Sequence, residues 1–213
     1  ASTESIIGGM LHKREDALIR LGDNGIGCNV TSSEDNYGED NVSFRRIRGT
    51  ITNQQYLLNP ETPPSLMSRD SNGTPLFTGY SEVPFTLVIP KTLAENNMSG
   101  PVVVFGHGFM GTGESTISGG ARAWKQAYNV SFLATDWYGW SNSDYDTVMN
   151  MLVNPSYFEH QTDRLQQAMI NKISMIRTMK GACSDISDLY SEETKLVNTD
   201  EIYYMGYSLG GIY

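Results

Sequence analysis

The sequence lacks several features that would point to broad classes of protein. Its 213 residues contain no unbroken apolar run of about 18 residues, the length of a membrane-spanning helix, so no transmembrane segment is predicted. Lysine and arginine total 15 against 24 aspartates and glutamates, which gives a formal net charge of −9. No basic patch or Lys/Arg run offsets this charge. The balance argues against nucleic acid or an anionic membrane surface as a partner.

Cysteine and histidine are also scarce. The sequence has two cysteines and three histidines, without metal-ligand spacing, and it has no phosphate-binding loop, so we expect neither a metal nor a cofactor. The acidic segment 32–40 lacks the complete ligand spacing of a calcium loop. Cys28 and Cys183 could form one disulfide that closes a very long loop, or remain two unrelated buried thiols; the sequence leaves both open.

The N-terminal residue is Ala1 rather than methionine, so we expect that a signal peptide or propeptide was removed, or that the sequence begins inside a longer protein. Asn-x-Ser/Thr triplets are somewhat more frequent than chance predicts, which weakly favours an exported protein that is secreted, periplasmic or at the cell surface. These triplets begin at Asn29, Asn41, Asn72, Asn97 and Asn129.

The strongest chemical signal is a Gly-x-Ser-x-Gly motif near the end of the sequence, Gly206-Tyr207-Ser208-Leu209-Gly210. In a nucleophile elbow this spacing places the serine on a strained strand-to-helix turn, and the glycines let the backbone pack closely. The motif alone is weak in a glycine- and serine-rich chain. Its context strengthens it, because residues 201–205 are typical of a strand and residues 209–213 could open a helix. We therefore predict that Ser208 is a catalytic nucleophile.

A second signal lies about a hundred residues upstream. Residues 101–105 form a continuous apolar run that predicts a strand buried on both faces, and a loop beginning Gly106-His107-Gly108 follows it. A glycine-rich loop of this kind leaves backbone N–H groups free to point at a developing negative charge. The N–H of the residue after the nucleophile completes the pair. We assign these two oxyanion-hole donors to Phe109 and Leu209.

His107 is expected to be a turn histidine held by local hydrogen bonds, which shapes the loop and does not act as general base, since it precedes the serine. Five further residues are expected to support the loop and the elbow around it. They are Gly106, Gly108, Gly206, Tyr207 and Gly210.

A third apolar run, residues 130–135, ends in Asp136-Trp137-Tyr138-Gly139 and a polar, aromatic turn. The order of His-Gly loop, helix, strand ending in Asp-x-x-Gly, long helix, strand and Gly-x-Ser-x-Gly resembles the α/β-hydrolase family, particularly its lipases and esterases. The resemblance covers about residues 83–213. More loosely, residues 163–167, Asp-Arg-Leu-Gln-Gln, together with residues 206–212 are similar to a group of large bacterial exported hydrolases.

The resemblance implies an α/β fold with a mostly parallel sheet and flanking helices. It also implies a Ser-His-acid mechanism in which Ser208 attacks an acyl carbonyl, forms an acyl-enzyme and releases the acyl group to water. The substrate would be a small-molecule acyl ester. Family order places the triad acid and then the histidine after the serine, so Asp136 is expected to anchor its own turn.

This sequence ends at Tyr213, soon after the serine. We therefore expect it to be the N-terminal part of a catalytic domain, truncated after the nucleophile strand. The nucleophile strand is central in this fold, so its edge would be exposed without the remaining part. A continuation or a second chain is expected to supply that part, with the triad acid and histidine.

The rest of the sequence predicts how the chain is divided into regions. Residues 1–41 are predicted to be a leading helix (5–21) and a solvated polar loop (22–41), which could form an N-terminal extension. Residues 42–213 are the hydrolase part, with strands at 42–52 and 83–89.

Two helices are predicted in the hydrolase part, over residues 114–128, with Trp124 in the core, and over 162–180. The second would carry an apolar stripe and end at Gly181, with His160 at its start. For the apolar residues between 145 and 160, packing is favoured over a substrate-lining flap. The stripe residues are Leu165, Met169, Ile173 and Ile176.

The leading interpretation is a serine hydrolase that cleaves carboxylic esters. A peptidase or an acyltransferase on the same scaffold is an alternative, because the two motifs name neither the acyl group nor its acceptor. A non-catalytic, hydrolase-like binding module is a second alternative, which the missing acid and histidine would favour.

Overall fold

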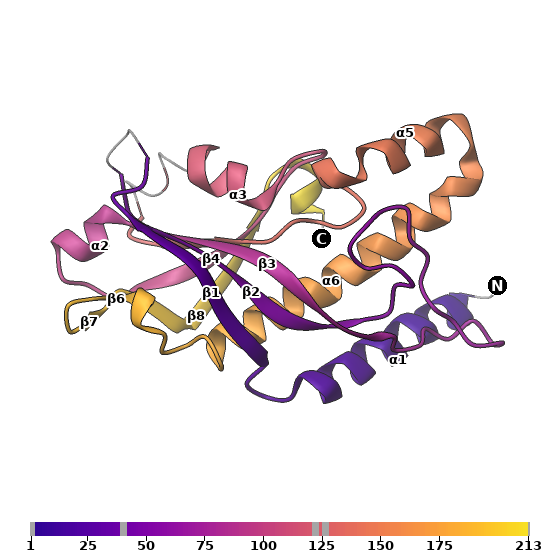
Figure 1. The fold of residues 1–213 in the computed structure, drawn as a ribbon, viewed down its shortest axis with the longest axis horizontal. Coiled ribbons are helices and arrows are strands. Elements are labelled where there is room, and N and C mark those ends of the chain that lie inside the picture. The colour runs from indigo at the N-terminus through magenta and orange to yellow at the C-terminus, as the bar shows by residue number, and fades with distance from the viewer. Residues whose placement is uncertain (1–2, 39–41, 121–123, 125–127, 213) are drawn as a thin grey trace.

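A mixed sheet forms the centre of the structure, a computed structural model that describes residues 3–38, 42–120, 124 and 128–212 (Figure 1). In the described part of the chain, this sheet has six strands. In spatial order they are β1 (Ile26–Asp35), β2 (Ser43–Gln55), β3 (Gly79–Pro90), β5 (Ser131–Ala134), β4 (Gly100–Gly106) and β8 (Val197–Gly206).

The sheet combines two kinds of pairing. β1, β2, β3 and β5 pair with one another in that order as antiparallel neighbours. β4 lies between β5 and β8 and is parallel to both. The carboxyl ends of β5, β4 and β8 therefore meet at one edge, which is where open α/β sheets place their ligand sites. The predicted α/β class with flanking helices is confirmed, with the parallel pairing concentrated in these three strands.

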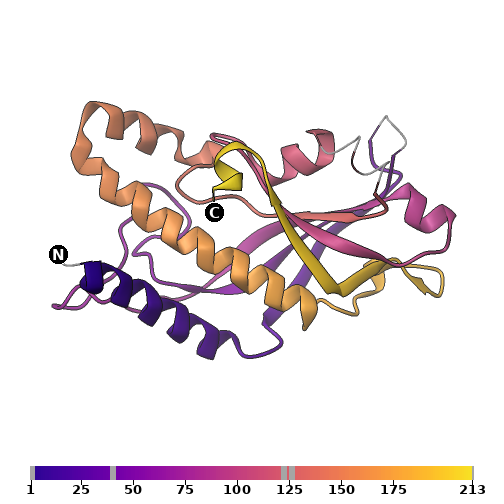
Figure 2. The same ribbon diagram turned by 180° about the vertical axis from the view of Figure 1, so that it is seen from behind.

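Helices flank this sheet on both sides. The α-helices are α1 (Thr3–Leu21), α2 (Lys91–Glu95), α3 (Gly113–Ser115), α5 (Tyr145–Val153) and α6 (Phe158–Lys180), and a π-helical turn η1 (Thr116–Gly120) extends α3. Short 3₁₀ turns are η2 (Asn142–Asp144), η3 (Pro155–Tyr157), η4 (Ser187–Leu189) and η5 (Ser208–Gly211), and β6 (Tyr190–Ser191) pairs with β7 (Thr194–Lys195). Figure 2 shows α6 lying along one face of the sheet with α1 beside it.

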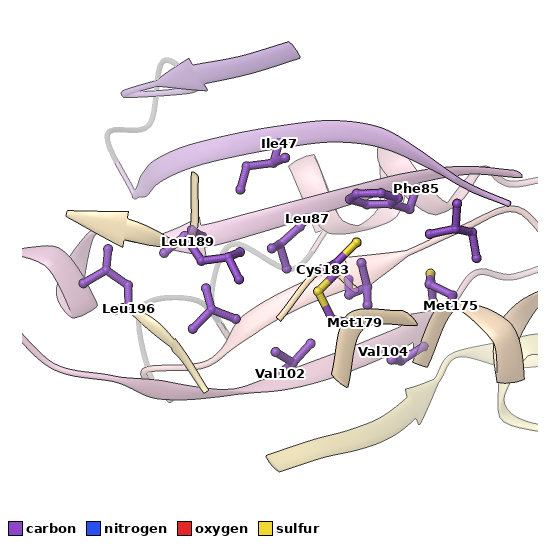
Figure 3. Packing of buried hydrophobic residues seen from close by; sticks show 14 of the residues in the cluster. Ile47, Phe85, Leu87, Val102, Val104, Met175, Met179, Cys183, Leu189 and Leu196 are labelled. Atoms are coloured by element: carbon purple, nitrogen blue, oxygen red, sulfur yellow. The ribbon is translucent and has the colours of Figure 1, made fainter. Parts of the chain in front are cut away.

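Alternating side chains divide the apolar core into two layers. Val102 and Val104 of β4 belong to a cluster that includes Met175 and Met179 of α6. Figure 3 shows these four side chains together with Leu87 and Cys183. Phe105, which follows Val104, belongs to a second cluster with Val88, Phe132 and Ile117 of η1, and Val103 packs against that cluster. Strands buried on both faces are continuous apolar runs, as predicted for residues 101–105.

The disulfide between Cys28 and Cys183 is formed in the structure, so the disulfide alternative holds and the alternative of two unrelated thiols does not. It joins β1 to the segment after α6, with 5.4 Å between the two Cα atoms and 155 residues between the two positions. Cys183 is fully buried in the larger cluster. The bond therefore fastens the edge of the sheet to the layer that covers it.

The solvated-loop prediction for residues 22–41 is wrong over residues 26–35. These residues form β1, which pairs with β2 through two register shifts. The sequence pattern does not predict β1, because β1 is an edge strand with polar, mostly exposed side chains. Its backbone hydrogen bonds are made with β2. Two ion pairs, Asp35–Arg45 and Glu34–Arg46, lie across this strand pair.

The apolar stripe predicted for the long helix is also wrong in detail. Met169 is exposed, and Ile173 and Ile176 are only half-buried. The buried face instead mixes Ala168, Met175 and Met179 with polar side chains, because the end of β2 that it covers is itself polar. Gln167 Nε2 donates to the Gln54 carbonyl at 2.8 Å, and Asn53 Nδ2 donates to Asn171 Oδ1.

Three other expectations on these helices have mixed outcomes. α6 begins at Phe158, so His160 lies in its first turn, and Gly181 caps it, both as predicted.

Trp124 is 46% exposed, so the prediction that it is a core residue is wrong. Most of residues 121–127 lie outside the described part of the chain. In α5, Thr147 and Val148 are buried while Leu152 and Val153 are exposed, so packing explains only part of this apolar segment.

We expect the double substitution Cys28→Ser/Cys183→Ser to lower the free energy of unfolding by about 2–5 kcal/mol, because the bond closes a long loop in the unfolded chain. Urea denaturation of the oxidised protein and of the variant would measure the difference. Reductant should destabilise the native protein by a similar amount and leave the variant unchanged. Equal stability of the two oxidised proteins would contradict the prediction.

Candidate active site

Ser208 stands at the junction between β8 and the 3₁₀ turn η5. Its φ of +54° lies in the left-handed region, which non-glycine residues rarely adopt. Tyr207 before it is extended, with φ −118° and ψ 136°. Ser208 is exposed to solvent. The strained strand-to-helix turn predicted from the Gly-x-Ser-x-Gly motif is therefore present, although it opens a 3₁₀ turn rather than an α-helix.

Three glycines allow this turn to pack on the end of β4. Gly206 pairs with Gly106 in the parallel ladder, and Tyr207 N donates to the Gly106 carbonyl at 3.2 Å. A Cβ atom on Gly210 would collide with the backbone carbonyl of Gly106, and one on Gly206 would collide with the carbonyl of Gly210. The Tyr204 hydroxyl donates to that same Gly210 carbonyl. Larger residues at these glycines would force the two strand ends apart.

The loop after β4 lies directly against the serine. A Cβ atom on Gly108 would lie 3.4 Å from Ser208 Cβ. The loop makes a tight turn in which Gly111 N donates to the Gly108 carbonyl at 3.1 Å and Met110 has φ +56°. Met110 N donates to the Trp140 carbonyl at 2.8 Å, which ties the loop to the turn after β5. The two glycine-rich motifs, about a hundred residues apart in sequence, therefore meet.

The amides of Phe109 and Leu209 are both without an acceptor in the part of the chain that the structure describes. Leu209 is the second residue of η5, and the first N–H groups of a helical segment have no partner within it. Phe109 occupies the first inner position of the loop turn, and its side chain is about half exposed. Both amides therefore belong to residues near Ser208 in the chain or in the adjoining loop, and both are free to donate to another group.

His107 is a buried structural residue. Its Nδ1 donates to the Gly108 carbonyl at 2.7 Å, and its Nε2 accepts from Trp137 N at 2.8 Å. Burial lowers the pKa of the imidazole, which favours the neutral form that this pair of hydrogen bonds requires. With both ring nitrogens engaged, His107 shapes the loop, as the sequence analysis expects.

The structure offers Ser208 no histidine partner among its described residues. His12 lies in α1, and His160 packs on Tyr157 at the start of α6 with 5.5 Å between ring centroids. No hydrogen bond joins any of the three histidines to Ser208 in the described part of the chain. Ser208 is therefore placed and exposed, but it is not paired with a base here.

Asp136 holds a neighbouring element rather than its own turn, so that expectation is corrected. Asp136 Oδ1 accepts from Gly113 N at 2.8 Å and fixes the first residue of α3. The turn after β5 is instead organised by Asp144, whose Oδ2 accepts from Gly139 N, Ser141 N and the Ser141 hydroxyl. Sequence reasoning could not choose between the two carboxylates, because both follow the same strand.

Lys172 of α6 lies beneath the ends of the parallel strands, a position that the sequence analysis missed. Its ammonium donates to the carbonyl of Thr135 at 3.0 Å and to that of Phe105 at 3.4 Å, and it lies 4.8 Å from the Trp137 ring centroid. Burial lowers the pKa of Lys172 to about 7, against an opposing effect of Asp136. Lys172 thus links the last residues of β4 and β5, from which the loops of the site begin.

An apolar cavity of about 620 Å³ opens beside the elbow. Gly108, Gly206 and Tyr207 form its wall toward the serine, and Ser115 and Thr116 supply its hydroxyls. The remaining lining is mainly apolar and aromatic: Phe105, Phe109, Gly111, Trp124 and Met205. Among the residues that the structure describes, none that lines this cavity is charged. Trp124 was missed as a site residue because helical spacing alone predicts a core position.

Comparison with solved structures shows the fold. A candidate acetyl xylan esterase from Bacteroides fragilis matches with a TM-score of 0.50 and 15% identity, over 95% of this chain and 46% of its own. Two structures of LipA, a rice cell wall degrading esterase from Xanthomonas oryzae, match at TM-scores of 0.33 and 0.31, with 14% and 13% identity, over 87% of this chain and 42% of theirs. The chain therefore spans less than half the length of these structures.

The fold is of the α/β-hydrolase type. No protein family matches the sequence, and neither does any curated protein. Among the described residues, no helix combines the length and the apolar character needed to cross a membrane.

The buried Lys172 should give the protein a pH-dependent stability. Between about pH 7 and the ordinary lysine pKa of 10.5, the unfolded chain holds a proton that the folded chain has released. The free energy of unfolding should therefore rise with pH across this window, and Lys172→Met should reduce the rise. Urea denaturation at pH 7 and pH 9 would measure it. Lys180→Met, at the exposed end of α6, is the matched control and should keep the native slope; an unchanged slope in Lys172→Met would refute the prediction.

Proposed function

We propose that the protein is a serine hydrolase that cleaves carboxylic esters through an acyl-enzyme on Ser208. The observation that carries this proposal is the position of Ser208. It is exposed at φ +54° and in contact range of Gly108, and the neighbouring residues Phe109 and Leu209 have amides without an acceptor among the described residues. A serine in this geometry can present its hydroxyl to an acyl carbonyl, while the two amides receive the negative charge that develops on the carbonyl oxygen.

The chemistry requires a base that the described residues do not supply. A serine hydroxyl becomes an effective nucleophile when a histidine accepts its proton, and a carboxylate orients that histidine. We place both in a further part of the catalytic domain, a continuation or a second chain. The coverage of the matched Bacteroides fragilis structure, 46% of its chain, leaves room for such a part.

The apolar cavity indicates which kind of acyl group the substrate would carry. A cavity of about 620 Å³ whose described lining is mainly apolar and carries no charge favours an apolar acyl chain, since a charged group would lose its water without gaining an ionic partner among these residues. Trp124, Phe109 and Met205 would contact the chain once its carbonyl carbon is at Ser208. The acyl group would therefore be larger than acetyl, a medium alkyl chain or an aromatic acid.

Export remains part of the proposal. The Cys28–Cys183 disulfide supports it, because such bonds form and persist in oxidising compartments. The alternative of a non-catalytic binding module draws on one observation, the absence of a histidine hydrogen bond to Ser208 among the described residues.

Treatment with a fluorophosphonate should label the protein once, at Ser208, and Ser208→Ala should abolish both the label and the hydrolysis of nitrophenyl esters. Intact mass measures the label. Ser156→Ala, at an exposed serine far from the motif in sequence, should react as the native protein does. Labelling that persists in Ser208→Ala would disprove the assignment, and the absence of any labelling would support the binding module.

Hydrolysis of nitrophenyl esters should become more efficient as the acyl chain lengthens from acetyl to octanoyl. Each buried CH₂ contributes about 0.8 kcal/mol, or about fourfold in kcat/KM. Trp124→Ala should reduce the gain for octanoate about tenfold or more and change acetate little. Tyr145→Ala, at an exposed tyrosine that lines neither cavity, is the aromatic control and should keep the native gain. A preference for acetate in the native protein would contradict the acyl assignment.

A further inference from the structure

A second cavity, of about 610 Å³, lies next to the apolar one. Ser115 lines both, so the two cavities adjoin at that residue. Residues from β3, from the end of β5, from α3 with η1 and from the turn after β5 line it, with Tyr37, Glu61 and Arg164. Neither the elbow nor the oxyanion loop contributes to it, and the proposed ester chemistry does not use it.

Arg164 is the first sign that this cavity is built for a ligand. The side chain is 1% exposed, yet its Nη1 has no hydrogen-bond partner in the described structure. The rest of the guanidinium is held firmly: Nε donates to Asp144 Oδ1 at 2.5 Å, and Cζ lies 4.8 Å from the Tyr138 ring centroid. A buried guanidinium N–H without an acceptor costs free energy. Because Arg164 lines the cavity, a ligand oxygen that displaced its covering side chains and reached Nη1 would recover that cost.

Other hydrogen-bonding groups line the same cavity. Asp136 accepts from Gly113 N through Oδ1, and no described residue donates a hydrogen bond to its Oδ2. Tyr138 adds a phenol, and Thr112 and Ser143 add hydroxyls that can donate or accept. The cavity therefore offers a cationic donor, an anionic acceptor and neutral hydroxyls together.

The charges of the lining restrict the ligand. Glu114 is neutralised by Arg46 and Arg48, which bind its two oxygens. Asp136 and Glu61 remain against Arg164, which is the single cation in the described part of the lining and already faces Asp144. An anionic ligand would meet excess negative charge, and an apolar one would leave the Arg164 donor unsatisfied. A neutral molecule rich in hydroxyl groups satisfies both the donor and the acceptor.

Aromatic rings provide the remaining surface. Tyr37, Phe85 and Tyr138 line the cavity, and the Arg46 guanidinium fixes the Tyr37 ring from a distance of 3.7 Å. Ring faces beside hydroxyl, carboxylate and guanidinium groups match a pyranose, which has apolar C–H faces and a rim of hydroxyls. We propose that this cavity binds a neutral saccharide, through Arg164, Asp136 and Tyr138.

Binding should be measured on Ser208→Ala, so that the result does not depend on turnover. The probes are the neutral trisaccharides maltotriose, cellotriose and xylotriose, with trigalacturonic acid as the anionic probe and hexane-1,6-diol as the apolar one. Calorimetry or ligand-observed NMR should show saturable binding of at least one neutral trisaccharide and weaker binding of the other two kinds of probe.

Two variants locate the site without disturbing the buried Arg164–Asp144 pair. Asp136→Asn removes the carboxylate acceptor and Tyr138→Phe removes the phenol, and each should weaken the neutral saccharide about tenfold or more. Asp136→Asn should also narrow the preference for neutral over anionic probes, which a merely structural role would not do. Asp23→Asn, an exposed aspartate before β1, is the matched control and should bind as the parent does.

The proposal is overturned if no neutral trisaccharide binds saturably, if the anionic probe binds better than the neutral ones, or if both site variants bind as the parent does. It stands apart from the ester chemistry. If a saccharide binds but fluorophosphonate does not label Ser208 in the native protein, the saccharide proposal stands and the hydrolase proposal fails. If Ser208 is labelled but no saccharide binds, only the saccharide proposal fails.

Discussion

The close contact between the ends of β4 and β8 is the constraint on which the rest of the site depends. Gly106, Gly206 and Gly210 meet there without side chains, so the turn that carries Ser208 rests directly on the backbone after β4. This close approach lets Gly108 lie against Ser208. The strain of φ +54° at Ser208 is tolerated because the surrounding backbone leaves the turn no relaxed alternative.

A layer of buried polar groups supports that contact from below. Lys172 binds the last carbonyls of β4 and β5, His107 connects its own loop to Trp137, and Asp144 gathers the turn after β5. Each of these groups has its partners, and so they can be buried at acceptable cost. They also explain why α6 is polar on its buried face, where an ordinary amphipathic helix would be apolar.

Two cavities of similar size adjoin at Ser115 and differ in chemistry. One has mainly apolar walls beside the turn that carries Ser208, and the other combines a buried guanidinium, a carboxylate and aromatic rings. The two cavities are therefore suited to ligand groups of different chemistry.

The sequence by itself determined the features that depend on local pattern. They are the strands around residues 42–52, 83–89, 101–105 and 201–205 and the helix that ends at Gly181. The strained turn at Ser208 and the local hydrogen bonding of His107 are two more. Apolar runs, glycines and their spacing express these features directly. Only the tertiary structure decided that the polar segment 26–35 is a strand, that Cys28 reaches Cys183, that Asp136 binds α3, and that Trp124 lines a cavity. Each of these depends on partners far away in the sequence, and their hydrogen bonds and burial outweigh the local preference of the residues themselves.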